Sequence, residues 1–121
     1  MSSFSTYTFK REKGQLASAW INFDGKTIGA RDNYNISSIT DLGVGRYRLT
    51  FDKVMANTGY TIQASCSKHY GADGTSLVSH NATVTIDVIT TDYFEITTSS
   101  VTQSHVAKFD PTIISISVFG D

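Results

Sequence analysis

The sequence predicts an all-β protein, a two-sheet antiparallel β-sandwich of about eight or nine strands. In every strongly patterned segment apolar and polar residues alternate, most clearly from Arg46 to Phe51. A period of two is typical of a strand with one buried face. Turn residues separate these segments at strand-length intervals, and we therefore expect no helix longer than about two turns.

The first part of the chain is expected to contain a lead-in segment followed by closely spaced strands. Residues 1–17 are rich in Ser and Thr and carry a short charged cluster, which predicts a linker or a thin strand before a sandwich module of residues 18–121. Ser18 to Phe51 is predicted to be a β-meander of roughly five short runs. Asp24-Gly25 and the loop from Gly43 to Gly45 tolerate positive φ, so the chain can reverse there.

Period-two alternation continues through the rest of the chain. It predicts strands at Tyr60 to Ser67, Ala82 to Ile89, Tyr93 to Thr98 and Ile114 to Val118. Pro111 precedes the last strand, where its missing N–H does no harm. Cys66 lies on the apolar side of its strand, and we interpret it as a small buried residue.

Composition argues against several classes of function. Ten basic and eleven acidic residues give a formal net charge of -1, which disfavours nucleic-acid and anionic-membrane binding. Cys66 is the only cysteine, so an internal disulfide framework and a thiolate metal site are excluded. No apolar run approaches the roughly 18 residues of a membrane span, and no signal-peptide pattern opens the chain. We expect a protein made in the cytosol, without membrane insertion.

No constellation of residues indicates an enzyme. The chain has no Gly-x-Ser-x-Gly elbow and no glycine loop that leads into a helix, so neither acyl transfer nor phosphate binding is predicted. Asp87, Asp92 and Glu95 are close in sequence and suggest a glycosidase pair. However, Asp87 falls on the polar side of a strand and Asp92 at a turn, where Asp is common. We predict no catalytic site and no cofactor.

Two segments lack clear strand patterning, Lys68 to Asn81 and Ser99 to Pro111. Long connections on a rigid scaffold often carry function, and ordinary hairpin loops are the alternative. We predict that the first segment carries the recognition surface, because Tyr gives a broad amphipathic contact while Lys and His form hydrogen bonds with acidic or hydroxyl-rich glycans. The candidate binding residues are Lys68, His69, Tyr70 and His80.

The three histidines, His69, His80 and His105, lack the close spacing of a metal-binding motif. We therefore predict no metal site within one subunit. Three copies of one histidine around a three-fold axis could hold a transition metal, and this alternative stays open.

The segment from Ala19 to Phe51 resembles a module found at the C-terminal ends of bacteriophage tail fibres and in related short virion proteins. The likeness lies in AWINFDG, an Arg, the run YNISSITD, and then Gly-x-Gly-x-Tyr-x-Leu-x-Phe. It resumes at Met55, Tyr60, Asp110-Pro111-Thr112 and Val118-Phe119-Gly120. The matching positions of the first part are Ala19, Trp20, Asn22, Phe23, Gly25, Arg31, Tyr34 to Asp41, Gly43, Gly45, Tyr47 and Phe51. Residues Ser67 to Lys108 match nothing in the module.

The resemblance implies a trimeric, all-β adhesive or structural module of a virion, without catalytic machinery. It implies a location in the virion tail, assembly in the host bacterial cytoplasm, other tail proteins as neighbours, and a bacterial surface glycan or receptor as the ligand. Sequence pattern adds only that Trp20 and Phe119 lie on the side of their strands opposite the apolar residues. Both are therefore expected to be covered at a subunit interface, or else by a loop of their own subunit.

Three classes of function thus remain. The first is a tail-fibre or tail-tip module that binds the host surface, and the second is a purely structural virion cap or trimerisation domain. The third is a free-standing carbohydrate-binding module. A sugar-binding protein exposes a flat aromatic platform, so solvent exposure of Trp20, Tyr70 or Tyr93 would favour the first and third classes over the second.

Overall fold

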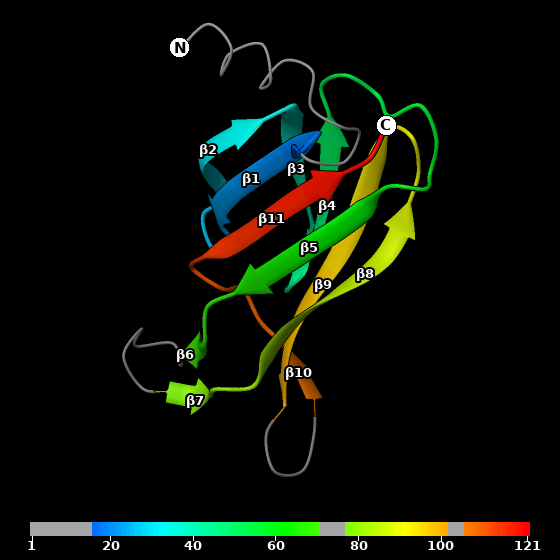
Figure 1. Ribbon diagram of the computed structural model, residues 1–121. Coiled ribbons are helices and arrows are strands. Elements are labelled where there is room, and N and C mark those ends of the chain that lie inside the picture. Colours follow the sequence, from blue (N-terminus) through cyan, green and yellow to red (C-terminus); the bar gives the residue numbers. More distant parts are fainter. Residues whose placement is uncertain (1–15, 71–76, 102–105) are drawn as a thin grey trace, which may run out of the picture.

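The computed structural model describes residues 16–70, 77–101 and 106–121, and this part of the chain consists of strands and loops without a helix (Figure 1). Its strands are β1 (Ala19–Asp24), β2 (Gly29–Tyr34), β3 (Ile36–Gly43), β4 (Arg46–Phe51), β5 (Thr61–Cys66), β6 (His69–Tyr70), β7 (Leu77–Ser79), β8 (Ala82–Ile89), β9 (Tyr93–Val101), β10 (Val106–Lys108) and β11 (Ile114–Phe119). The predicted all-β class is confirmed. The described strands exceed the expected eight or nine because β6, β7 and β10 are too short to show alternation.

The longer strands form two antiparallel sheets. Sheet A has the order β2-β1-β11-β5, and sheet B has the order β10-β9-β4-β3, with β8 also paired with β9. In Figure 1, β1 (blue), β11 (red) and β5 (green) lie side by side in front of β4 and β9. The strands β6 and β7 form a separate two-stranded hairpin at one end.

The prediction of one meander from Ser18 to Phe51 was wrong. The β1-β2 hairpin belongs to sheet A and the β3-β4 hairpin to sheet B, so the chain changes sheets at Asn35. Asn35 adopts a φ of 59°, and asparagine tolerates this left-handed conformation better than most residues. Its Oδ1 accepts from the Lys53 N–H at 2.6 Å, and its Nδ2 donates to the Ser18 carbonyl at 3.2 Å. These bonds fix the crossing between the sheets.

The core lies between the two sheets and is built by the predicted alternation. Buried side chains come from every second position of β1, β4, β9 and β11. The Phe23 ring of sheet A meets the Tyr47 ring of sheet B edge to face, with the centroids 5.3 Å apart. Cys66 is half-buried on the inner side of β5, and burial raises the pKa of its thiol. This arrangement is consistent with the expected sandwich.

A joint at one end of the core ties the sheets together, and we call it the Asp110 joint (Gly25, Gly45, Tyr47 and Asp110). Asp110 Oδ1 accepts from the Gly45 N–H and from the Tyr47 hydroxyl, both at 2.7 Å. Burial and the neighbouring Asp110 carboxylate raise the pKa of Tyr47, so this hydroxyl stays a donor. The Gly25 N–H donates to the Pro111 carbonyl at 2.8 Å.

The two glycines of the joint are needed for different reasons. A Cβ on Gly25 would lie 2.5 Å from the Tyr47 hydroxyl oxygen and 2.6 Å from the Pro111 carbonyl oxygen, so close approach excludes a side chain. The expected positive φ in this turn falls on Ile28, at 58°, and not on Gly25. Gly45 combines a φ of 68° with a Cβ position 2.6 Å from the Thr98 carbonyl oxygen.

Candidate functional site

The segment predicted to carry recognition forms the β6-β7 hairpin, of which residues 71–76 lie outside the described residues. Lys68, Tyr70 and His80 are exposed, and Tyr70 retains 39% of its accessible surface. His69 faces the sandwich instead. Its ring stacks on Phe109 with centroids 4.3 Å apart, and its Nδ1 lies 2.7 Å from Ser100 Oγ. The structure therefore leaves three of the four predicted binding residues open to a ligand.

The pKa of His69 is lowered from its ordinary value, first by desolvation and then by the positive charge of Lys26. Both causes favour the neutral imidazole. A neutral ring suits the stack on Phe109 and the hydrogen bond to Ser100, so His69 holds the hairpin to the sandwich.

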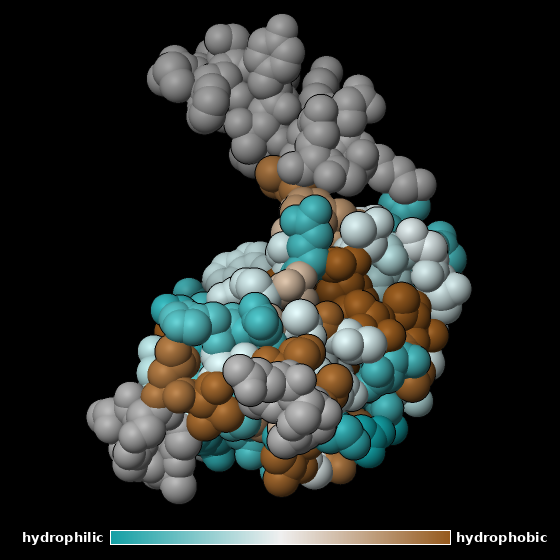
Figure 2. All heavy atoms as spheres, turned by 90° about the horizontal axis from the view of Figure 1, so that it is seen from below, coloured by the Kyte–Doolittle hydropathy of each residue, from teal (hydrophilic) through white to brown (hydrophobic). Residues whose placement is uncertain are grey.

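The end of the molecule that carries the hairpin also exposes hydrophobic side chains. They are Tyr70, Leu77, Val78, Val101 and Val106. Figure 2 views the molecule from this end and shows hydrophobic areas interrupted by hydrophilic ones. The hairpin end is thus a mixed surface and does not present one continuous apolar face.

The outer face of sheet A carries a second candidate surface, which the sequence did not reveal as a site. Register across β1, β11 and β5 places Trp20, Ser117 and Gln63 in one row. The next row consists of Asn22, Ser115 and Ser65. These two rows line a depression in the outer face of sheet A, which has a volume of about 550 Å³. We call this depression the sheet A trough.

The shape of the trough follows from side-chain size. The central strand β11 contributes only Ser115 and Ser117 to the outer face, which gives a low floor. Trp20 on β1 and Gln63 on β5 rise on either side of it. Trp20 is 37% exposed, while its neighbours Ala19 and Ile21 are buried, which confirms the predicted orientation of Trp20.

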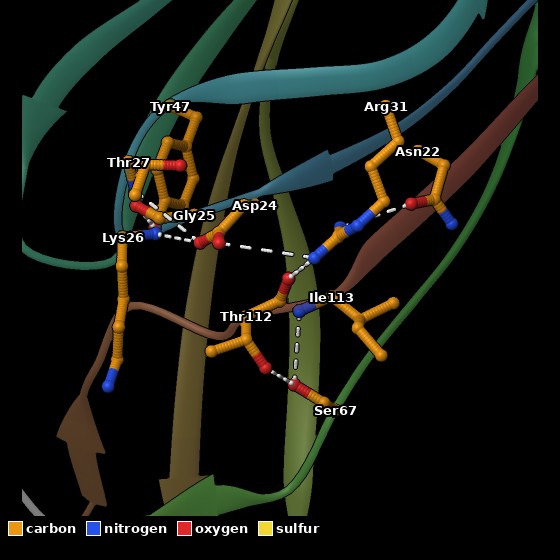
Figure 3. A network of polar contacts seen from close by, with 10 residues as sticks. All are labelled: Asn22, Asp24, Gly25, Lys26, Thr27, Arg31, Tyr47, Ser67, Thr112 and Ile113. Atoms are coloured by element: carbon orange, nitrogen blue, oxygen red, sulfur yellow. Dashed lines mark hydrogen bonds and ion pairs between the residues drawn. The ribbon is translucent and has the colours of Figure 1, made fainter. Parts of the chain in front are cut away.

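A polar network holds one corner of the trough (Figure 3). Asn22 Nδ2 donates to Ser115 Oγ at 3.0 Å, and Asn22 Oδ1 accepts from Arg31 Nη1 at 3.2 Å. Arg31 is the extra residue of a β-bulge between β1 and β2, and its Nη2 donates to the Thr112 carbonyl at 2.6 Å. The same nitrogen lies 3.9 Å from Asp24 Oδ2. Arg31 is therefore engaged on three sides, and the Asn22 amide has a fixed orientation.

The other predicted interface residue, Phe119, is half-buried near the end of β11, on the same side of the strand as Ser115 and Ser117. The only signals for the trough in the sequence were the alternating serines of β11 and the outward Trp20. Neither signal identifies the partner strand β5, because β11 and β5 are distant in sequence. Gln63 and Ser65 were missed for that reason.

No group of three or more His, Cys, Asp or Glu side chains within the described residues is placed to hold a metal ion. His105, which the three-fold metal alternative includes, lies outside those residues. The same part of the chain contains no helix that could span a membrane.

Comparison of the chain with protein-family models, with curated proteins and with solved structures found no match.

Proposed function

We propose that the chain is a tail-fibre or tail-tip module of a bacteriophage that binds a glycan on the host surface as a homotrimer. The observation that carries this proposal is the resemblance of Ala19 to Phe51 to the tail-fibre module. Distant positions of the resemblance, Gly25, Tyr47 and Asp110, meet in a single joint of the fold. This convergence supports a likeness of architecture, because isolated matches have no reason to be in contact.

Exposed aromatic residues support binding over a purely structural role. Trp20 and Tyr70 are 37% and 39% exposed, as a sugar-binding platform requires. Trp20 would also be exposed in a single subunit if it lay at a trimer interface, so Tyr70 is the residue that favours binding over a structural cap or trimerisation domain. The second candidate is a free-standing carbohydrate-binding module, which the trough on the outer face of sheet A would suit equally well.

The proposed location is the virion tail, with assembly in the host bacterial cytoplasm and contact with other tail proteins. Three copies would multiply each weak contact with the host, which is how a small domain can gain avidity. Trp20 and Phe119 are the interface residues expected from sequence. An interface through Trp20 and a ligand-accessible trough exclude each other, so a variant at this position distinguishes them.

Adsorption of the purified domain to candidate host cells, with and without their surface polysaccharide, tests the function. We expect binding that is lost when the polysaccharide is stripped. Tyr70→Ala and Lys68→Ala test the hairpin, and Val54→Ala and Lys53→Ala are matched controls because both residues are exposed outside the hairpin and outside the lining of the trough. Equal binding to stripped and intact cells would contradict a glycan receptor.

Light scattering at micromolar concentration tests the trimer. We expect a mass near three times 13.2 kDa, and a mass near 13.2 kDa would refute the assembly. Trp20→Glu should then give soluble monomers if Trp20 lies at the interface. A trimer that persists in this variant would place the interface elsewhere.

A further inference from the structure

We propose that the sheet A trough binds a neutral sugar ring, with the indole of Trp20 as the stacking platform and Gln63, Ser65 and Ser117 as hydrogen-bonding groups. This site is separate from the β6-β7 hairpin. The inference deepens the proposed function and rests on it only for the source of the glycan.

The trough combines the two kinds of contact that a sugar ring offers. The C–H face of a pyranose packs on an aromatic ring, and the exposed indole of Trp20 provides such a surface on one side. Hydroxyl groups need both donors and acceptors, which the Gln63 amide and the serine hydroxyls supply. The volume of about 550 Å³ lies within the range of small-ligand sites.

The polar groups of the trough are available to a ligand. The side chains of Gln63, Ser65 and Ser117 form no hydrogen bond with any described residue. Asn22 is already oriented by Arg31 and Ser115, and its amide keeps one N–H and one lone pair for a further partner. The site is therefore pre-organised at one corner and open across its floor.

The charge of the trough selects a neutral ligand. Its lining residues are Trp20, Ile21, Asn22, Gln63, Ala64, Ser65, Ser115, Ile116 and Ser117, and none of them is ionisable. The guanidinium of Arg31 is not part of this lining, and it donates to Asn22 and to the Thr112 carbonyl. A carboxylated sugar in the trough would lose hydration without a cation among the lining residues, which is costly.

The composition of the trough also argues against cover by a second subunit. The buried centre of a homodimeric or trimeric interface is enriched in apolar residues and depleted in serine. Here Trp20 adjoins a floor of Ser115 and Ser117. A subunit packed on this floor would have to satisfy several buried hydroxyls, whereas a sugar satisfies them directly.

Fluorescence titration tests the proposal, because Trp20 is the only tryptophan of the chain. The full chain is titrated to high millimolar concentration with maltose, cellobiose, lactose, mannobiose and chitobiose, and with glucuronic acid as a charged comparison. We expect at least one neutral sugar, and not glucuronic acid, to change the Trp20 emission with saturation.

Two variants identify the site. Ser117→Val fills the floor with a residue that favours strands, and Gln63→Ala removes the opposite wall. Each should weaken the saturable response at least tenfold. Ser99→Val is the matched control, because Ser99 is an outward-facing residue of the central strand β9 in sheet B. A response unchanged by Ser117→Val, or no response to any neutral sugar, would overturn the proposal.

Cell adsorption of the same variants separates the two proposals. If the wild-type chain adsorbs to host cells but shows no saturable sugar response that Ser117→Val weakens, the trough proposal fails and the host-binding function stands. If the wild-type chain binds a neutral sugar through the trough but adsorbs to no host cell, the trough proposal stands and the virion function fails. A shift of mass in Ser117→Val without any sugar response would assign the trough to a subunit interface.

Discussion

The outer faces of the two antiparallel sheets differ in how their central polar side chains are paired. On sheet B, Arg48 Nη2 and Nε lie 2.6 Å and 2.8 Å from Glu95 Oε2, and the guanidinium covers the Tyr93 ring at 4.1 Å. Glu95 is only 7% exposed although it faces outward. Thr97 donates to the Asp87 carboxylate beside it. Arg48, Glu95 and Asp87 on this face are thus paired within the sheet.

In the sheet A trough, Asn22 donates a hydrogen bond to Ser115. The side chains of Gln63, Ser65 and Ser117 have no hydrogen-bond partner among the described residues. The same alternation of apolar and polar residues along the strands produces the outer faces of both sheets. This periodicity alone therefore does not distinguish a binding face from an inert one. The difference lies in whether neighbouring rows carry complementary groups. Open hydrogen-bonding capacity beside an aromatic platform is the feature that we associate with function.

The largest loss of stability is expected from a substitution in the Asp110 joint, because this joint connects the two sheets. Gly45→Ala should destabilise the fold by at least about 2 kcal/mol, because it combines a left-handed φ with a clash against backbone. Urea unfolding measures this loss. Because the two sheets would lose a common connection, the same variant should also weaken any ligand binding at the outer face of either sheet.

Two other glycines serve as controls for Gly45→Ala. Gly43→Ala has a φ of 128° but open space around its Cβ, so it tests backbone strain alone. Gly29→Ala has an ordinary φ and a nearest contact of 3.4 Å to the Thr27 hydroxyl, and should change stability little. Equal stability of Gly45→Ala and Gly29→Ala would show that the joint does not hold the sheets together.

The next largest loss of stability is expected on the outer face of sheet B, and it can be compared directly with a substitution on sheet A. Arg48→Ala leaves the nearly buried Glu95 carboxylate without its partner, and should cost about 1–2 kcal/mol. Gln63→Ala on sheet A removes a side chain without internal bonds, and should stay within about 0.5 kcal/mol. Thermal unfolding of the two variants provides the measurement. A similar loss in both would remove the distinction between a satisfied and an open face.

Much of the fold was predictable because alternation reports directly on burial. The strands Ala82–Ile89 and Ile114–Phe119, the orientation of Trp20 and the partly buried Cys66 all follow from a period of two. Which sheet a strand joins was not predictable. The crossing at Asn35 depends on bonds to Ser18 and Lys53, and no local pattern encodes these distant contacts.

The candidate site was less predictable than the fold. Lys68 and Tyr70 could be identified as exposed because their segment is polar and rich in turn residues. The trough could not, because Gln63 and Ser117 become neighbours only through the pairing of β5 with β11. The prediction for His69 failed in the opposite way. His69 was predicted to bind a ligand, but its ring is hydrogen-bonded to Ser100 and stacked on Phe109 within the fold.

The smallest effect concerns this histidine, which belongs with the internally satisfied groups. The pKa of His69 is lowered in the folded state, so the unfolded chain binds its proton more readily. Its contribution to stability is therefore fully present above about pH 6.5 and is lost as the pH falls through the folded pKa. His69→Asn should reduce the decline of the urea midpoint between about pH 7 and about pH 5, only slightly, because the ring remains partly open to water. His80→Asn is the matched control for the substitution itself, since His80 is exposed on the same hairpin. An identical pH profile in wild type and His69→Asn would show that the folded environment does not lower the pKa of His69.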